Sequence, residues 1–245
     1  MAGLLLLLIP CAASLGQGLG YSIWEKSTGE TEPVISWYGQ TGLVLIPSAL
    51  VGPAASVQGG AHWVNTDWVV GTAEEDLWLY SATVSLTDDL EVGAARLHHV
   101  PVVTGGAPQF DDATIMNAKY RVPLGSLADV ANAPDIAFGI WDITNDLNRG
   151  YYVVASKALH TRDVGGPADL TVTAGLGNNE ADEGTMDGFF AGVEIAPAPM
   201  FRLQAEYDAE NFNAALRFFP TTSLSLDFAT IDGDLGVGAS FRFGF

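Results

Sequence analysis

Basic side chains are scarce in this sequence. The chain has 10 Lys and Arg against 29 Asp and Glu, which gives a formal net charge of −19. Proteins that bind nucleic acid cluster Lys and Arg on the surface that meets the phosphates, so this composition excludes nucleic acid as a partner. The same imbalance disfavours a general attraction to anionic lipid headgroups.

Cysteine and long apolar runs are also lacking. The single cysteine, Cys11, excludes a disulfide framework. Beyond residue 20, no segment approaches the roughly 18 to 20 apolar residues of a transmembrane helix. The histidines and the cysteine are not spaced as in a structural zinc site, and no Gly-rich run between a strand and a helix fits a phosphate cradle. We therefore expect no cofactor and no structural metal.

The first 20 residues predict a secretory signal peptide, because the apolar core LLLLLIP is followed by small residues. LIPC resembles a lipobox, although Pro10 stands where lipoproteins have a small residue. Ordinary cleavage and lipidation of Cys11 therefore both remain open. Residues 21–54 are expected to form a periplasmic segment. Within it, Gly42 and Pro47 bracket a short extended piece. We expect this piece to line or plug the periplasmic mouth of a membrane barrel formed by the rest of the chain.

The last twelve residues, DLGVGASFRFGF, alternate between large apolar and small or charged side chains. Such alternation predicts a strand with one apolar face. It recurs between residues 55 and 245 in about twelve segments separated by turn residues such as APAP, FPTT and IDGD. The chain is therefore expected to form one all-β domain, with a short helix at LGSLADVANA between two strands.

The residues on the polar faces favour a membrane barrel over a soluble β-sandwich, the alternative fold. They are mostly Gly, Ser, Asn and Gln with single charges of both signs, which suits a confined interior. Turning the strands inside out would place Arg202, Arg217 and Arg242 in lipid, at about 2–4 kcal/mol each near the midplane. We predict a transmembrane antiparallel β-barrel of about 12 strands (range 10–14) spanning residues 55–245 in the outer membrane.

Two sets of side chains follow from this orientation. Aromatic residues are expected to face lipid near the strand ends: Trp63, Trp78, Tyr80, Tyr120, Tyr152, Tyr207, Phe218 and Phe245. A charged network is expected to fill a narrow lumen: Lys119, Arg121, Lys157, Glu194, Arg202, Glu206, Asp208, Arg217, Asp227 and Arg242. Within it, the three arginines named above are expected to meet Glu194, Glu206 and Asp227 across the lumen. On the strand containing Lys157, we assign Tyr151, Val153 and Ala155 to the lumen, and Tyr152, Val154 and Ser156 to lipid.

The C-terminal aromatics Phe241, Phe243 and Phe245 resemble the signal by which the outer-membrane assembly machinery recognises barrels. That machinery, outer-membrane lipid and lipopolysaccharide are the expected partners. With both barrel ends in the periplasm, NTDWVVGTAEED, HVPVVTGGAPQFDD and GNNEADEG become outer loops. Their carboxylates, and those of IDGD, lack the spacing of an EF-hand. These carboxylates therefore either bind divalent cations weakly or only keep the loops soluble.

An enzymatic function is the alternative of another class. His98 and His99 lie at a strand end, where one of them could serve as a base for Ser81 or Ser85 in a rim hydrolase or acyltransferase. No motif supports this pairing, so we do not expect an enzyme.

Three segments resemble YjbH-type proteins, outer-membrane barrels linked to exopolysaccharide production or export. The segments are TGLVLIPSALVGPAASVQGGAHW, PDIAFGIWDITNDLNRGYYVVASKAL and GFFAGVEIAPAPMFRLQAEYDAENFNAALRF. The matched residues are Gly42, Pro47, Asp135, Gly139, Asp142, Ser156, Lys157, Glu206, Tyr207, Asp208 and Asn213. The resemblance implies an accessory role in surface-polysaccharide secretion, as a scaffold or narrow conduit beside export components. This chain lacks the additional regions of larger members, and a small generic pore remains the alternative.

Overall fold

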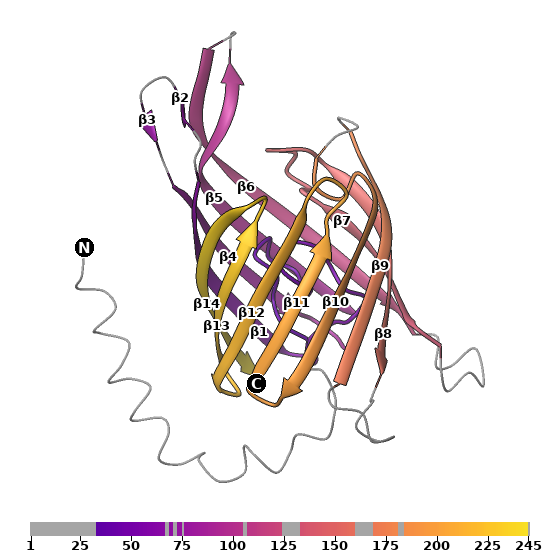
Figure 1. The fold of residues 1–245 in the computed structure, drawn as a ribbon. Coiled ribbons are helices and arrows are strands. Elements are labelled where there is room, and N and C mark those ends of the chain that lie inside the picture. Colours follow the sequence, from indigo (N-terminus) through magenta and orange to yellow (C-terminus); the bar gives the residue numbers. More distant parts are fainter. Residues whose placement is uncertain are drawn as a thin grey trace. The chain divides into compact units, whose positions relative to one another are not determined.

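The computed structural model describes residues 33–66, 69–70, 73–74, 76–104, 107–123, 133–159, 169–180 and 184–244 (Figure 1). The expected signal peptide, residues 124–132 of the expected helix at LGSLADVANA, and Phe245 lie outside these residues. Every element in the described residues is a strand. Among these residues, no helix is long and apolar enough to cross a membrane.

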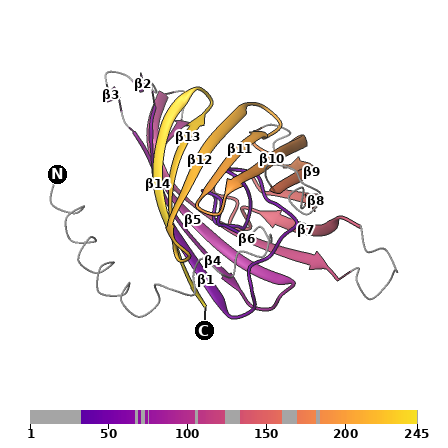
Figure 2. The same ribbon diagram turned by 60° about the horizontal axis from the view of Figure 1, so that its bottom comes forward.

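Twelve antiparallel strands close into a barrel, in which the first strand pairs with both the second and the last (Figures 1 and 2). They are β1 (Ser56–Asn65), β4 (Leu77–Ser85), β5 (Leu90–Thr104), β6 (Ala107–Val122), β7 (Asp135–Trp141), β8 (Gly150–Leu159), β9 (Asp169–Asn179), β10 (Gly188–Ala198), β11 (Phe201–Tyr207), β12 (Phe212–Thr221), β13 (Leu224–Ile231) and β14 (Asp234–Gly244). A small hairpin of β2 (Val69–Val70) and β3 (Ala73–Glu74) interrupts the connection from β1 to β4. The predicted strand number and barrel closure are confirmed.

Turn chemistry and register explain why neighbouring strands meet in order. Between β13 and β14, Ile231 pairs with Asp234, which leaves Asp232 and Gly233 as a two-residue turn. Both turn residues have positive φ, 53° and 90°, as the Asp-Gly hairpin turn requires.

We call the end of the barrel that holds Ser56 and Gly244 the lower end, and the end that holds Asn65 and Asp234 the upper end (Figure 1).

The outer surface of the barrel is apolar, and it is formed by alternate residues of each strand. On β11 and β12, Leu203 and Leu216 face outward and are 47% and 38% exposed, whereas Gln204 and Arg217 are buried inside. The same outward positions carry large apolar side chains on other strands: Trp78, Tyr80, Tyr120, Val172, Leu176, Phe189, Phe228, Val237 and Phe243. Closure also satisfies the backbone hydrogen bonds of these strands without an exposed edge.

The lumen contains a folded segment of the same chain. Residues 33–53, here called the plug segment, form a compact loop inside the ring of strands (Figure 2). Two isolated bridges, Ile35 to Thr41 and Gly42 to Pro47, hold the loop together. Most of its side chains are buried. The sequence predicted only an extended piece at the periplasmic mouth, whereas the segment turns back on itself within the barrel.

The assignment of faces on β8 was wrong. Tyr152, Val154 and Ser156 point into the lumen and are buried, while Tyr151 is 56% exposed on the outside. Lys157, on the face opposite Ser156, therefore lies on the outer side near the lower end, where its ammonium donates to the carbonyl of Ala133 (3.3 Å). Both faces of this strand are apolar because its inner face packs against the plug segment, so hydrophobicity could not distinguish them.

The interior is also less polar than the sequence predicted. Around Trp37, Val44 and Ile46 of the plug segment lies an apolar cluster that includes lumen-facing residues of the wall. Those wall residues include Leu79, Leu97, Ile115, Trp141, Tyr152, Val154 and Phe190. A charged network therefore fills only part of the lumen, and the plug segment with its apolar contacts fills another part.

Candidate functional site

Two ion pairs link neighbouring strands on the inner wall. Arg217 of β12 lies directly opposite Asp227 of β13, and its Nε donates to the Asp227 carboxylate, with both side chains buried. On β11, the neighbour of β12 on the side away from β13, Arg202 donates to Glu194 of β10 at 3.1 Å. Strand pairing sets these contacts, because each partner sits on the inward face at a matching height. Buried charges require such partners.

A third buried pair holds the plug segment directly. Lys119 of β6 lies 3.0 Å from Glu91 of β5 and is essentially inaccessible to solvent. Its ammonium also donates to the carbonyls of Thr41 (2.7 Å) and Ser48 (2.9 Å). Glu91 in turn accepts the backbone N–H of Thr41 at 2.8 Å. The pair thus binds both ends of the loop 41–48.

Glu206 of β11 binds the tip of the same loop. Its carboxylate accepts the backbone N–H groups of Val44 (2.9 Å) and Leu45 (2.8 Å), and the side-chain amide of Asn213 (3.2 Å). The sequence predicted that Glu206 would pair with an arginine across the lumen. In the structure its hydrogen-bond partners are three N–H groups of the plug segment, the third being that of Ile46 at 3.5 Å, and the side-chain amide of Asn213. Asp208, just beyond β11, is also bound by Asn213, at 2.9 Å.

Aromatic and backbone contacts complete the attachment. Trp37 stacks on His62 of β1 with 4.4 Å between ring centroids, and it packs over Gly236 of β14, where a Cβ would lie 2.5 Å from the indole. The hydroxyl of Tyr152 donates to the side-chain carbonyl of Gln40 at 2.6 Å. The N–H of Ala49 donates to Ser156 Oγ at 2.8 Å.

Tyr38, the tyrosine of the plug segment, stays neutral in this environment. Burial, reinforced by the nearby charge of Asp208, raises the pKa of its phenol to about 12. Its backbone carbonyl accepts a hydrogen bond from the Asn117 side chain (2.6 Å).

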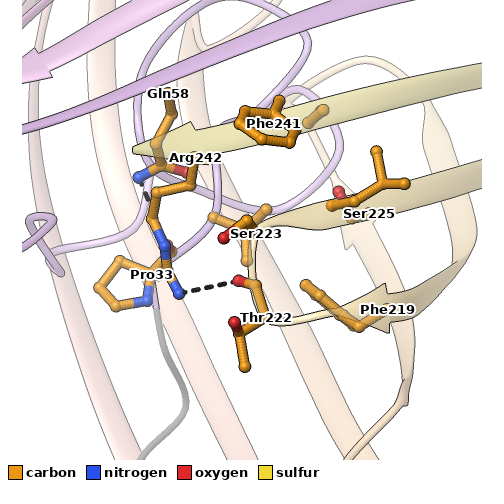
Figure 3. A pocket seen from close by; sticks show the side chains of 11 residues that line it. Pro33, Gln58, Phe219, Thr222, Ser223, Ser225, Phe241 and Arg242 are labelled. Atoms are coloured by element: carbon orange, nitrogen blue, oxygen red, sulfur yellow. Dashed lines mark hydrogen bonds between the residues drawn. The ribbon is translucent and has the colours of Figure 1, made fainter. Parts of the chain in front are cut away.

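Two small cavities lie beside the plug segment. One cavity of about 20 Å³, enough for a single water molecule, lies between the start of the plug segment and β13–β14 (Figure 3). Arg242 lies at its edge and donates to the carbonyl of Thr222 at 3.3 Å. Gln58 donates to Pro33 at 3.4 Å in the same place. A second cavity of the same size lies beside Arg202 and Glu194.

The remaining predicted lumen residues lie at the lower end. Arg121 is partly exposed and pairs with Asp89 at 2.9 Å, and it lies 3.9 Å from Asp135. Arg242 is likewise only partly buried. These two arginines therefore line the lower rim, whereas the buried part of the network consists of Lys119, Glu194, Arg202, Glu206, Asp208, Arg217 and Asp227.

The residues matched to the YjbH-type motifs have structural positions of their own. Gly42 and Pro47 form one bridge of the plug segment, and a Cβ at Gly139 would lie 2.1 Å from the Tyr152 ring. Asp142 accepts the backbone N–H groups of Leu147 (2.7 Å) and Asn148 (2.8 Å), which folds the connection between β7 and β8. Tyr207 lies on the outer face, with its ring 5.0 Å from that of Phe212.

The sequence reasoning missed several residues that hold the plug segment. On the wall, Glu91, Gln58 and Asn117 each contact the plug segment. In the plug segment, Trp37 and Thr41 contact the wall. Glu91 and Asn117 occupy inward positions of alternating strands, so strand parity alone could have identified them as lumen residues. Their partners could not be found in this way, because the plug segment has no strand periodicity.

The structure does not bring His98 together with Ser81 or Ser85, a pairing considered from the sequence and not expected. His98 lies on the outer face, where its Nδ1 is 2.9 Å from Asp112 and its ring contacts Tyr80. Ser81 and Ser85 are buried on the inner face. The barrel wall thus separates them from His98. Within the described residues, no group of three or more His, Cys, Asp or Glu side chains is arranged to hold a metal ion.

No model of a protein family matches the sequence, and no curated protein matches it. Among solved structures, the chain is similar to the N-terminal β-barrel domain of Pseudomonas aeruginosa OprF, with 14% identity over 78% of this chain and 98% of that one, and a TM-score of 0.26. Pseudomonas putida OprB matches at 14% identity over 77% and 91%, with a TM-score of 0.30. Yersinia pestis Ail matches at 11% identity over 77% and 95%, with a TM-score of 0.16. At these scores the likenesses carry no argument about function.

Proposed function

We propose that this protein is an integral outer-membrane β-barrel whose lumen is closed by its own plug segment, and that it has an accessory role in the export of surface polysaccharide. In this role it acts as a scaffold beside export components. The polysaccharide part of the proposal is supported by the resemblance to YjbH-type sequences.

The observation that carries the membrane placement is the inversion of polarity between the two faces of the wall. Leu203, Leu216 and Phe228 face outward, while Arg217 and Asp227 on the same strands are buried inside. A water-soluble barrel of this kind would expose a continuous apolar surface, which soluble monomers avoid. Hydrocarbon accepts that surface, and it demands the closed hydrogen-bonded wall that the strands provide.

The filled lumen favours a scaffold over an open diffusion pore. The plug segment is buried between opposite walls, and the two cavities beside it are each only about 20 Å³. In this state we expect little steady conductance.

Membrane insertion is tested by refolding the full-length protein with lipid vesicles and floating them on a density gradient. We expect the protein to float with the vesicles and to migrate faster on a gel before boiling than after it. Protein that stays at the bottom of the gradient would contradict the membrane placement.

The accessory role is tested by deleting the gene and staining the cell surface for polysaccharide. We expect reduced surface polysaccharide, restored by the wild-type gene on a plasmid. An unaltered surface in the deletion strain would overturn this role and leave the barrel assignment standing.

A further inference from the structure

We infer that the plug segment is a gate, and that its displacement opens a hydrophilic conduit selective for cations. This inference rests on the proposed membrane placement. It goes beyond a scaffold role, because it assigns the closed barrel a latent transport activity and a class of permeant solute.

The plug segment can leave without breaking the barrel. Its two β-bridges both lie within the segment itself, and the twelve strands close around the lumen through their own pairing. The segment is bound to the wall by hydrogen bonds to wall side chains and by packing, as with the N–H of Ala49 and Ser156 Oγ (2.8 Å). Every strand–strand hydrogen bond of the wall would therefore survive its displacement.

Two wall carboxylates would then lose partners in the plug segment: Glu91, which keeps its ion pair with Lys119, and Glu206. Arg217 with Asp227 and Arg202 with Glu194 are pairs between wall residues, and they stay neutralised when the plug segment moves. Glu206 differs, because three backbone N–H groups of the plug segment bind its carboxylate. Of these contacts only that with Asn213 remains. A fixed negative charge facing a water-filled lumen favours cations.

The closed state is held by more than this contact. Displacement would expose the apolar cluster around Trp37, Val44 and Ile46, and burial of such side chains is strongly favourable. The gate is therefore expected to open rarely in the isolated protein. Weakening the contact at Glu206 is the mildest way to raise the opening frequency, since it leaves the cluster in place.

The experiment records single channels from the full-length protein in planar bilayers, after flotation has shown insertion. Glu206→Gln keeps the shape of the side chain and removes its charge, which weakens hydrogen bonds to it. We expect about tenfold more frequent openings than in wild type, with lower preference for K⁺ over Cl⁻ in each opening. Glu180→Gln, at an exposed carboxylate of the upper end, is the matched control and should behave as wild type.

A reversible lock identifies the moving part and does not depend on Glu206. Ala49→Cys with Ser156→Cys, on a Cys11→Ser background that removes the native thiol, ties the plug segment to β8 under oxidising conditions. We expect openings to disappear on oxidation and to return on reduction. Openings that persist in the oxidised form, or a Glu206→Gln variant that inserts and opens no more often than wild type, would overturn the gate. Failure to insert would instead contradict the membrane placement.

Discussion

At the scale of single residues, the backbone of the plug segment meets the backbone of the wall at two glycines. Gly39, with φ of +79°, faces Gly93 of β5, and a Cβ on Gly93 would lie 1.6 Å from the Gly39 carbonyl oxygen. That contact is with backbone, so a side chain cannot simply rotate away. Position 93 therefore has to be glycine for the plug segment to pack against β5 as it does.

We expect Gly93→Ala to lower the free energy of unfolding by about 1–3 kcal/mol or more, the usual result of overpacking. Gly59→Ala is the matched control, because a Cβ there would meet its nearest neighbour, Ser81 O, at an ordinary 3.6 Å. Urea unfolding in detergent, followed by tryptophan fluorescence, measures both variants. Equal stability of the two would show that the plug segment does not pack against β5 as described.

At the scale of the strand, the sequence identified the faces well wherever polar and apolar side chains alternate. On β11, β12 and β14 the predicted faces match the observed burial, as with Arg202, Glu206 and Arg217 inside. β8 reads Tyr-Tyr-Val-Val at its start, which offers no alternation. Which of its two faces points into the lumen depends on packing against the plug segment. That contact joins residues far apart in sequence, so the local pattern of side chains does not predict it.

A charge placed at different depths on one outer face tests the position of the membrane. Leu216→Arg near the middle of β12 should lower the free energy of unfolding by about 2–4 kcal/mol, and Phe212→Arg at the upper end by about 0–1 kcal/mol. Both residues face outward on the same strand. The measurement is reversible unfolding in lipid vesicles. If the two variants are equally stable, β12 does not cross hydrocarbon in this orientation.

At the scale of the whole molecule, strand number and closure were predictable because each strand carries its own period and turn. The interior was not. Gly42 and Pro47 marked a local feature, but the contacts of its loop with Glu206 and Lys119 join residues up to 162 positions apart. Such contacts depend on the completed barrel. The sequence therefore predicted most of the lumen charges correctly, but it placed Lys157 on the wrong face and assigned Glu206 the wrong partner.

Trp37 connects the plug segment to the place where the barrel closes. It stacks on His62 of β1 and packs over Gly236 of β14, the two strands whose pairing joins the beginning of the barrel to its end. Because contacts between residues so far apart in sequence form late and at a high entropic cost, a buried indole spanning both strands should stabilise the closed form specifically.

We therefore expect Trp37→Ala to lower the free energy of unfolding by about 3–5 kcal/mol, as large core truncations do, and to reduce the yield of the fast-migrating folded form on refolding. Trp78→Ala is the control, because it removes the same side chain from the outer face, where Trp78 is 42% exposed. Its loss should be smaller because no cavity forms inside the barrel. An equal loss for both tryptophans would mean that Trp37 contributes only apolar area, and that closure of β1 against β14 proceeds without the plug segment.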